Sequence, residues 1–201
     1  MSEGRVLVIA CGAIACELVR IRDMNGWDHI TFQCLPPELH NRPADIPGAV
    51  LDRIAEERHR FEKIFVAYAD CGTGGRLDRA LVGTGVERIP GAHCYEFYSG
   101  SETFSRIAEE EAGSFYLTDF LVRHFERLVW KGLGLGRYPE LAPSYFGNYR
   151  RVVYLAQTRD EKLREMARGH AEKLGLDYVY HHTGDEPLSL LLDPQLGQES
   201  A

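Results

Sequence analysis

Short apolar runs rich in β-branched and aromatic residues alternate along this chain with amphipathic helical segments, and this alternation constrains the fold more than any other feature. The predicted strands are Val6–Ala10, Ile30–Gln33, Ile64–Tyr68, Val86–Ile89, Phe115–Leu117, Val152–Leu155 and Tyr178–His181. Strands that alternate with helices favour parallel pairing, because a parallel pair needs a crossover connection that is usually a helix. We therefore predict an α/β fold with three layers, in which helices cover both faces of a mostly parallel sheet.

The helical segments carry apolar residues at a spacing of three and four. They are Pro47–Arg60, Ser101–Glu111, Thr118–Trp130 and Arg159–Leu174. Proline is tolerated in the first turn of a helix, so Pro47 marks a helix start. Gly175 is typical of a helix end, because glycine adopts the left-handed conformation that terminates many helices.

The length of 201 residues suits one domain with a sizeable core, which we place at residues 1–195. The stretch at residues 132–149 is rich in glycine, proline and tyrosine. A long ordered connection with one short helix is its simplest interpretation, and a subdomain junction or a lid is the alternative. Residues 196–201 are predicted to be a disordered tail.

Charge and hydropathy exclude several classes of partner. The formal net charge is −7 and no run of lysine and arginine occurs, so nucleic acid is not expected as a partner. No apolar stretch approaches the ~20 residues that span a bilayer, so no membrane is expected either. The amino-terminal segment MSEGRVLVIACG enters a strand at once and lacks the features of a secretory signal, which predicts a cytoplasmic protein with reduced thiols.

Three of the five cysteines lie where a predicted strand gives way to a turn: Cys11, Cys71 and Cys94. Because the carboxyl ends of parallel strands share one edge of the sheet, these thiols can converge without any short spacing in the sequence. Convergent thiols in a cytoplasmic protein indicate metal binding or catalysis rather than disulfides. Taken singly, each could equally be a small buried apolar residue. Cys16 lies in a helical stretch and Cys34 at a strand end before two prolines, and both are interpreted as core or incidental thiols.

A fourth ligand is available in the loop CLPPELHNRP, where prolines restrict the chain on both sides of His40. Three thiolates and one imidazole suit tetrahedral zinc. Three thiolates alone would suit an iron–sulfur cluster with one open iron. Both metals accept sulfur ligands, so both remain open at this stage.

Residues beside these ligands suggest further roles. Asp70 could orient a ligand or accept a proton, and Tyr98 could donate a hydrogen bond to a substrate oxygen, although packing is the simpler role for a tyrosine. Gly12 allows a sharp turn after the first strand. Gly72 and Gly74 suit a tight turn or a phosphate-binding loop, although ADCGTGG matches neither the dinucleotide nor the P-loop pattern. We therefore treat these three glycines as candidate cofactor-binding positions.

Several of these segments resemble a bacterial and archaeal family known as domain of unknown function 1638. The similar segments are ACGA, LPPELHNRP, YADCGTGG, RIPGAHCYEFYSG, FYLTDFLVRHFERLV and YFGNYRRVVYLAQT, and the resemblance covers roughly positions 5–192. Similar proteins are often encoded beside corrinoid proteins and trimethylamine-type methyltransferases. The resemblance therefore implies a role in corrinoid-linked one-carbon metabolism, with a small-molecule substrate or a corrinoid protein as partner.

The leading hypothesis is a cytoplasmic metal–thiolate protein that acts in, or supports, corrinoid-linked methyl transfer. A bound zinc ion could activate a thiol or water, and an open cluster iron could bind a small ligand. One alternative is a non-catalytic accessory protein that binds a corrinoid or methyltransferase partner. Another is a metal-free enzyme with a nucleophilic cysteine, for which Cys71 on its glycine-rich turn is the candidate.

Overall fold

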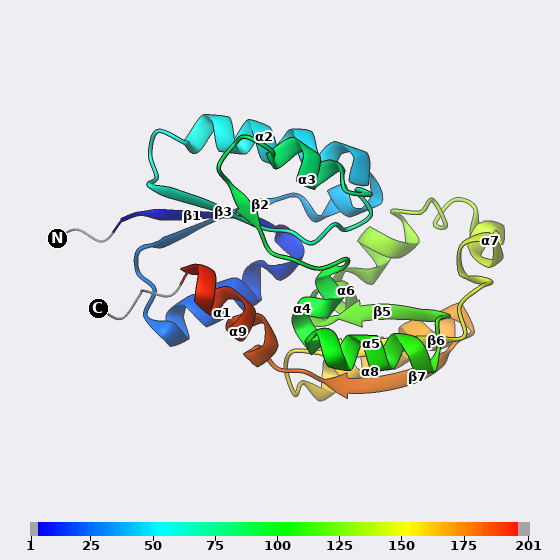
Figure 1. The fold of residues 1–201 in the computed structure, drawn as a ribbon. Helices are drawn as coiled ribbons and strands as arrows, with labels where there is room; N and C mark the ends of the chain where they lie inside the picture. Colours follow the sequence, from blue (N-terminus) through cyan, green and yellow to red (C-terminus); the bar gives the residue numbers. More distant parts are fainter. Residues whose placement is uncertain (1–3, 197–201) are drawn as a thin grey trace. The chain divides into compact units, whose positions relative to one another are not determined.

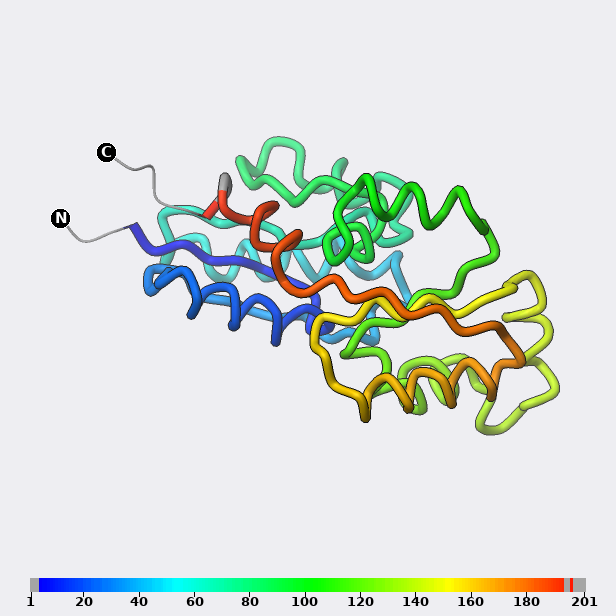
Figure 2. Tube along the Cα trace, turned by 90° about the horizontal axis from the view of Figure 1, so that it is seen from below, coloured from blue at the N-terminus to red at the C-terminus, as the bar shows by residue number. Residues whose placement is uncertain are grey.

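A computed structural model describes residues 4–196 of the chain, which form two compact units (Figures 1 and 2). The first unit contains residues 4–94 and 188–196, and the second contains residues 95–187. The chain thus crosses between the units twice. The sequence instead predicts one domain over residues 1–195. The tail predicted for residues 196–201 lies outside the described residues, apart from Leu196, which ends a helix.

The first unit is built on a four-stranded parallel sheet with the strand order β2-β1-β3-β4. The strands are β1 (Val6–Cys11), β2 (Ile30–Leu35), β3 (Lys63–Ala67) and β4 (Glu87–Arg88). Every residue of the central strand β1 is buried, because it has a neighbouring strand on each side and helices on each face. Its continuous run of apolar residues is typical of such a strand.

Helices cover both faces of this sheet (Figure 1). On one face lie α2 (Ile46–Glu57) and α3 (Arg76–Leu81), and on the other lie α1 (Ala15–Asn25) and α9 (Glu186–Leu196). The α1 and α9 helices touch where Asn25 Nδ2 donates to Ser189 Oγ over 3.4 Å. From Leu188 onward, α9 therefore belongs to the first unit and packs in the same core as β1.

The second unit has its own parallel sheet with the strand order β5-β6-β7. Its strands are β5 (Ser114–Thr118), β6 (Arg151–Ala156) and β7 (Asp177–His182). Side chains of β6 alternate between two cores, as the pleat of a strand requires. Val152, Tyr154 and Ala156 pack in the core that contains α6 (Asp119–Phe125) and α8 (Glu161–Leu174), and Val153 and Leu155 pack against Ile107 of α5 (Ser101–Glu110).

The predicted helix at residues 118–130 begins as α6 and continues as one π-helical turn (Glu126–Trp130). The irregular stretch after it contains a short 3₁₀ turn (Pro139–Leu141) and α7 (Ala142–Phe146). Leu135 and Phe146 of this stretch are buried in the core of the second unit. Gly175 ends α8 in the left-handed conformation, as the sequence predicts.

The predicted α/β class is confirmed, because both units consist of parallel strands with helices on their faces. The strands are divided between two sheets, whereas the sequence suggests one. Within residues 4–196, no helix is both long enough and apolar enough to cross a bilayer. The carboxyl edge of the first sheet carries the cysteines on which the candidate site depends.

Candidate metal centre

The turn after β3 presents Cys71 in an unusual backbone conformation. Cys71 has φ of 46°, in the left-handed region that residues with a side chain rarely adopt. Two backbone hydrogen bonds hold this turn to the segment before Cys94, from Asp70 N to Gly91 O and from Cys71 N to Ala92 O, each 3.0 Å long. Left-handed residues other than glycine cluster at functional sites, where the surrounding structure imposes the strain.

The carboxylate of Asp70 organises the rest of this turn. Its Oδ1 accepts hydrogen bonds from Thr73 Oγ1 at 2.7 Å and from Gly75 N at 2.7 Å, and its Oδ2 accepts one from Gly74 N at 3.0 Å. These bonds, led by that from Thr73, lower the pKa of Asp70 to about 2. Asp70 therefore acts as an ionised clamp for the loop that carries Cys71, and its predicted part in catalysis stays a prediction.

His40 reaches the same edge of the sheet on a loop made rigid by proline. The loop contains two 3₁₀ turns, Pro37–Asn41 and Pro43–Asp45. A side-chain carbon on Gly12 would lie 3.1 Å from both Leu35 O and Pro37 Cδ, so the absence of a side chain there lets the loop approach β1 closely. A similar atom on Gly72 would contact Pro43 at 3.7 Å. Gly72 and Gly74 have φ of 81° and 61°, so the turn itself requires glycine at both positions.

Among the described residues, His40, Cys71 and Cys94 bring their ligand atoms together. One nitrogen of His40 and the sulfurs of the two cysteines all lie within 4.8 Å of one another. Cys71 is buried, Cys94 is half-buried at the start of α4 (Cys94–Ser99), and His40 is exposed. Ligands at about 2.0 to 2.3 Å from one zinc ion lie about 3.3 to 3.8 Å apart. A small inward movement would therefore place these three atoms around one metal ion.

The two thiols of this group have pKa values shifted in opposite directions. A hydrogen bond from the Cys94 side chain is the main cause that lowers the pKa of the Cys71 thiol, against the opposing effect of burial. The same contact and burial raise the pKa of the Cys94 thiol well above its usual range. Partial loss of water around the imidazole ring and the neighbouring His93 lower the pKa of His40. The lowered pKa values of Cys71 and His40 favour a thiolate and a neutral imidazole, which are the forms that bind metals.

Cys11 lies outside this group of three, although it is the third predicted thiol ligand. It is the last residue of β1, it is buried, and its sulfur accepts a hydrogen bond from Ala13 N at 3.5 Å. Burial raises the pKa of the Cys11 thiol to about 11. Its sulfur is near enough for charge on Cys71 to contribute to this shift. Cys16 and Cys34 are exposed and do not belong to the group.

Tyr68 is a candidate site residue that the sequence analysis does not identify. It follows β3 directly, and its side chain is buried with a hydroxyl that has no hydrogen-bond partner in residues 4–196. The hydroxyl lies beside the Cys11 thiol, which is one cause of the raised pKa of Tyr68, after burial. An aromatic residue at a strand end is usually a packing residue, so the sequence alone gives no signal for it. Tyr98, which the sequence proposes for substrate contact, is buried in α4 within the second unit.

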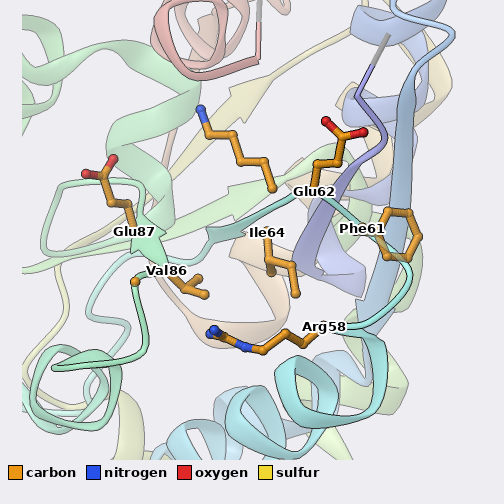
Figure 3. A pocket seen from close by; sticks show the side chains of 8 residues that line it. Arg58, Phe61, Glu62, Ile64, Val86 and Glu87 are labelled. Atoms are coloured by element: carbon orange, nitrogen blue, oxygen red, sulfur yellow. The ribbon is translucent and has the colours of Figure 1, made fainter. Parts of the chain in front are cut away.

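The first unit also has a surface pocket, but at the opposite edge of the sheet (Figure 3). It has a volume of about 410 Å³ and lies where β3 and β4 begin, whereas the cysteines lie beyond their carboxyl ends. Its lining residues are Arg58, Phe61, Glu62, Lys63, Ile64, Gly85, Val86 and Glu87. None of these is a predicted ligand or catalytic residue, so we place the candidate site at the cysteine edge.

A protein-family model matches most of the chain. The family described as protein of unknown function (DUF1638) matches residues 34–192. The chain belongs to this family. The match includes His40, Cys71 and Cys94, and begins after Cys11. No curated protein and no solved structure matches the chain.

Proposed function

We propose that this member of the DUF1638 family binds one metal ion through His40, Cys71 and Cys94. The observation that supports this most directly is the approach of one imidazole nitrogen and two sulfurs to within 4.8 Å of one another. The rigid loop of His40 and the clamped turn of Cys71 bring residues far apart in sequence to this point. Such a set of soft and borderline donors binds zinc and similar ions.

Zinc fits this donor set better than an iron–sulfur cluster. Two thiolates and one imidazole are the ligands of a known class of catalytic zinc site, in which the fourth position is open. A cluster with one open iron is held by three thiolates, whereas the group that comes together here includes the imidazole of His40. We therefore propose a single zinc ion, with a fourth position for water, a substrate or a further side chain.

Zinc in such a site would act as a Lewis acid toward a thiol or water at the fourth position. Methyl transfer linked to a corrinoid is the reaction class that the family resemblance implies, and a corrinoid protein or small molecule would be the partner. Thiols stay reduced in the cytoplasm, so a cytoplasmic location suits such a site. A site whose fourth position is closed would instead support the accessory role.

One observation favours a second candidate function. The Cys71 thiol has a lowered pKa and lies on a glycine-rich turn, which are features of a nucleophilic cysteine. In this alternative, Cys94 and His40 would assist proton transfer, and no metal would be needed. Metal analysis distinguishes the two functions.

We expect the protein, purified without oxygen from cells supplied with zinc and iron, to contain one zinc ion per chain and to be colourless. The His40→Ala variant should bind zinc about tenfold or more weakly, because a metal site loses comparable affinity even when a partner of a ligand is removed. Competition with a chromophoric chelator measures this affinity. Cys16→Ser is the matched control, because Cys16 is a thiol outside the group, and it should bind zinc as the wild type does.

Three outcomes would contradict the zinc site. A brown protein with iron and sulfide would indicate a cluster. A protein without metal, in which alkylation of Cys71 alone is rapid at neutral pH, would support the nucleophilic cysteine. Equal zinc affinity in the wild type and in His40→Ala would remove His40 from the site.

A further inference from the structure

The buried hydroxyl of Tyr68 needs an explanation that its packing does not provide. The side chain is only 2% exposed, and within residues 4–196 its oxygen has no hydrogen-bond partner. Buried polar groups almost always have a partner, because leaving one unsatisfied costs free energy that burial of the ring does not return. A phenylalanine would fill the same space without this cost. The hydroxyl therefore indicates a role that needs a hydrogen-bond donor at this position.

The register of the sheet shows where that partner must be. Ala10 of β1 pairs with Ala67 of β3 in parallel register, so the next residues, Cys11 and Tyr68, lie side by side at the carboxyl edge. Paired residues of neighbouring parallel strands point to the same face of the sheet, which brings the phenol beside the Cys11 sulfur. Electrostatic interactions connect Tyr68 with Cys11 and with Cys71. The hydroxyl therefore lies near Cys11 and within electrostatic reach of Cys71, a member of the proposed metal site.

We propose that Cys11 is the fourth ligand of the metal and that Tyr68 positions it by donating a hydrogen bond to its sulfur. This inference rests on the proposed function. A neutral thiol sulfur is a weak acceptor, so the contact between the hydroxyl and Cys11 falls short of a well-formed hydrogen bond. A thiolate is a much stronger acceptor, and hydrogen bonds to charged groups are the stronger ones. When the metal–sulfur bond forms, the Cys11 proton passes to solvent and no electron is transferred.

The geometry around Cys11 permits this change. Its sulfur interacts electrostatically with both Cys71 and Cys94 while it lies outside their 4.8 Å group. The hydrogen bond from Ala13 N is long, at 3.5 Å, so it restrains the sulfur only weakly. Binding of the metal would thus close a site of three cysteines and one histidine, which is the form of the proposed site that supports the accessory role. Tyr68 would then orient Cys11, as the hydrogen-bond partner of a metal ligand does.

Cobalt(II) is the probe that tests this inference, because thiolate-to-cobalt charge-transfer absorption scales with the number of sulfur ligands. Cys11→Ser should reduce this absorption by about a third, from three thiolates to two. Tyr68→Phe should keep the full intensity at saturation, bind cobalt 10- to 100-fold more weakly, and move the band to lower energy. The shift follows because a sulfur that loses a hydrogen bond gives up its electrons more readily.

A double-mutant cycle separates positioning from packing. In a Cys11→Ala background, Tyr68→Phe should cause no further loss of cobalt affinity, because alanine has no acceptor for the phenol. Tyr178→Phe in the second unit is the matched control and should leave both the spectrum and the affinity unchanged. Its hydroxyl has a backbone partner, Arg164 O, at 3.4 Å.

Different experimental outcomes would contradict this inference and the proposed function. If the wild type binds no cobalt, both are wrong. If His40→Ala weakens cobalt binding while Cys11→Ser retains the full charge-transfer intensity, the three-ligand site stands and Cys11 is not a ligand. If Tyr68→Phe matches the wild type in affinity and band position, Tyr68 has only a packing role.

Discussion

Replacement of Asp119 by alanine is expected to destabilise the second unit by roughly 3 to 5 kcal/mol, because it leaves several buried donors without an acceptor. Asp119 is 1% exposed and joins the carboxyl ends of β5 and β6. Its Oδ1 accepts from the Tyr154 hydroxyl at 2.6 Å and from Gln157 N at 3.1 Å. Its Oδ2 accepts from Thr158 N at 3.1 Å and from the Thr158 hydroxyl. Burial and this carboxylate raise the pKa of Tyr154, which keeps its phenol a donor.

The Asp119→Asn variant sharpens this prediction. Asparagine has nearly the same shape, but its amide nitrogen is a donor and would face another donor at one of the two oxygen positions. We therefore expect Asp119→Asn to lose most of the same stability, as measured by urea unfolding. Asp177→Asn, at an exposed position of β7, is the control and should change stability by less than about 0.5 kcal/mol. A loss below about 1 kcal/mol in Asp119→Asn would show that shape, rather than charge, holds the strand ends together.

The sequence predicts the α/β class well because the class depends on local periodicity. The apolar run of β1, the amphipathic α8 and its end at Gly175 all follow from residues close together in the chain. The division into two sheets depends instead on which strands pair, and that is decided by contacts between distant residues. The pattern FYLTDFL is similarly ambiguous. Thr118 Oγ1 caps α6 and Asp119 is buried at the ends of β5 and β6, although both residue types are common helix caps.

The candidate site was predictable only in part for the same reason. Placement at strand ends identifies the cysteines, and proline on both sides identifies the His40 loop. The distance of each thiol from the others depends on side-chain direction, which reverses with every residue of a strand. Cys11 is still within β1, whereas Cys71 lies four residues beyond the end of β3 and is turned by its left-handed backbone. Residue types alone predict neither the direction of the Cys11 side chain nor the lack of a well-formed hydrogen bond at the Tyr68 hydroxyl.

Replacement of Asp70 by alanine is expected to weaken metal binding by up to about 100-fold although Asp70 is not itself a proposed ligand. Its three hydrogen bonds hold the loop at residues 71–75, in which Cys71, Gly72, Gly74 and Gly75 all have positive φ. Without the clamp, these residues regain conformational freedom, and Cys71 must lose that freedom again when it binds the metal. Stability of the metal-free protein should also fall, by roughly 2 to 3 kcal/mol.

The Asp70→Asn variant should be intermediate, and this grading is the decisive part of the prediction. An asparagine whose oxygen replaces Oδ1 keeps the bonds from Thr73 and Gly75 and loses the one from Gly74. We expect its metal affinity to fall between that of the wild type and that of Asp70→Ala, with Asp52→Ala on the exposed face of α2 as the unchanged control. Equal affinity in all four proteins would show that the loop holds Cys71 in place without the carboxylate.

The pH dependence of stability provides an independent measure of the clamp. The folded pKa of Asp70 is about 2, whereas an aspartate in an unfolded chain titrates near 3.9. The carboxylate therefore stabilises the fold fully above about pH 4, and this contribution is lost as the pH falls toward 2. The Asp70→Ala variant lacks this contribution at every pH. The metal-free wild type and the variant should therefore converge in stability as the pH falls from about 4 toward 2. Stabilities that stay apart down to pH 2 would mean that Asp70 supports the Cys71 turn through its shape and not through its charge.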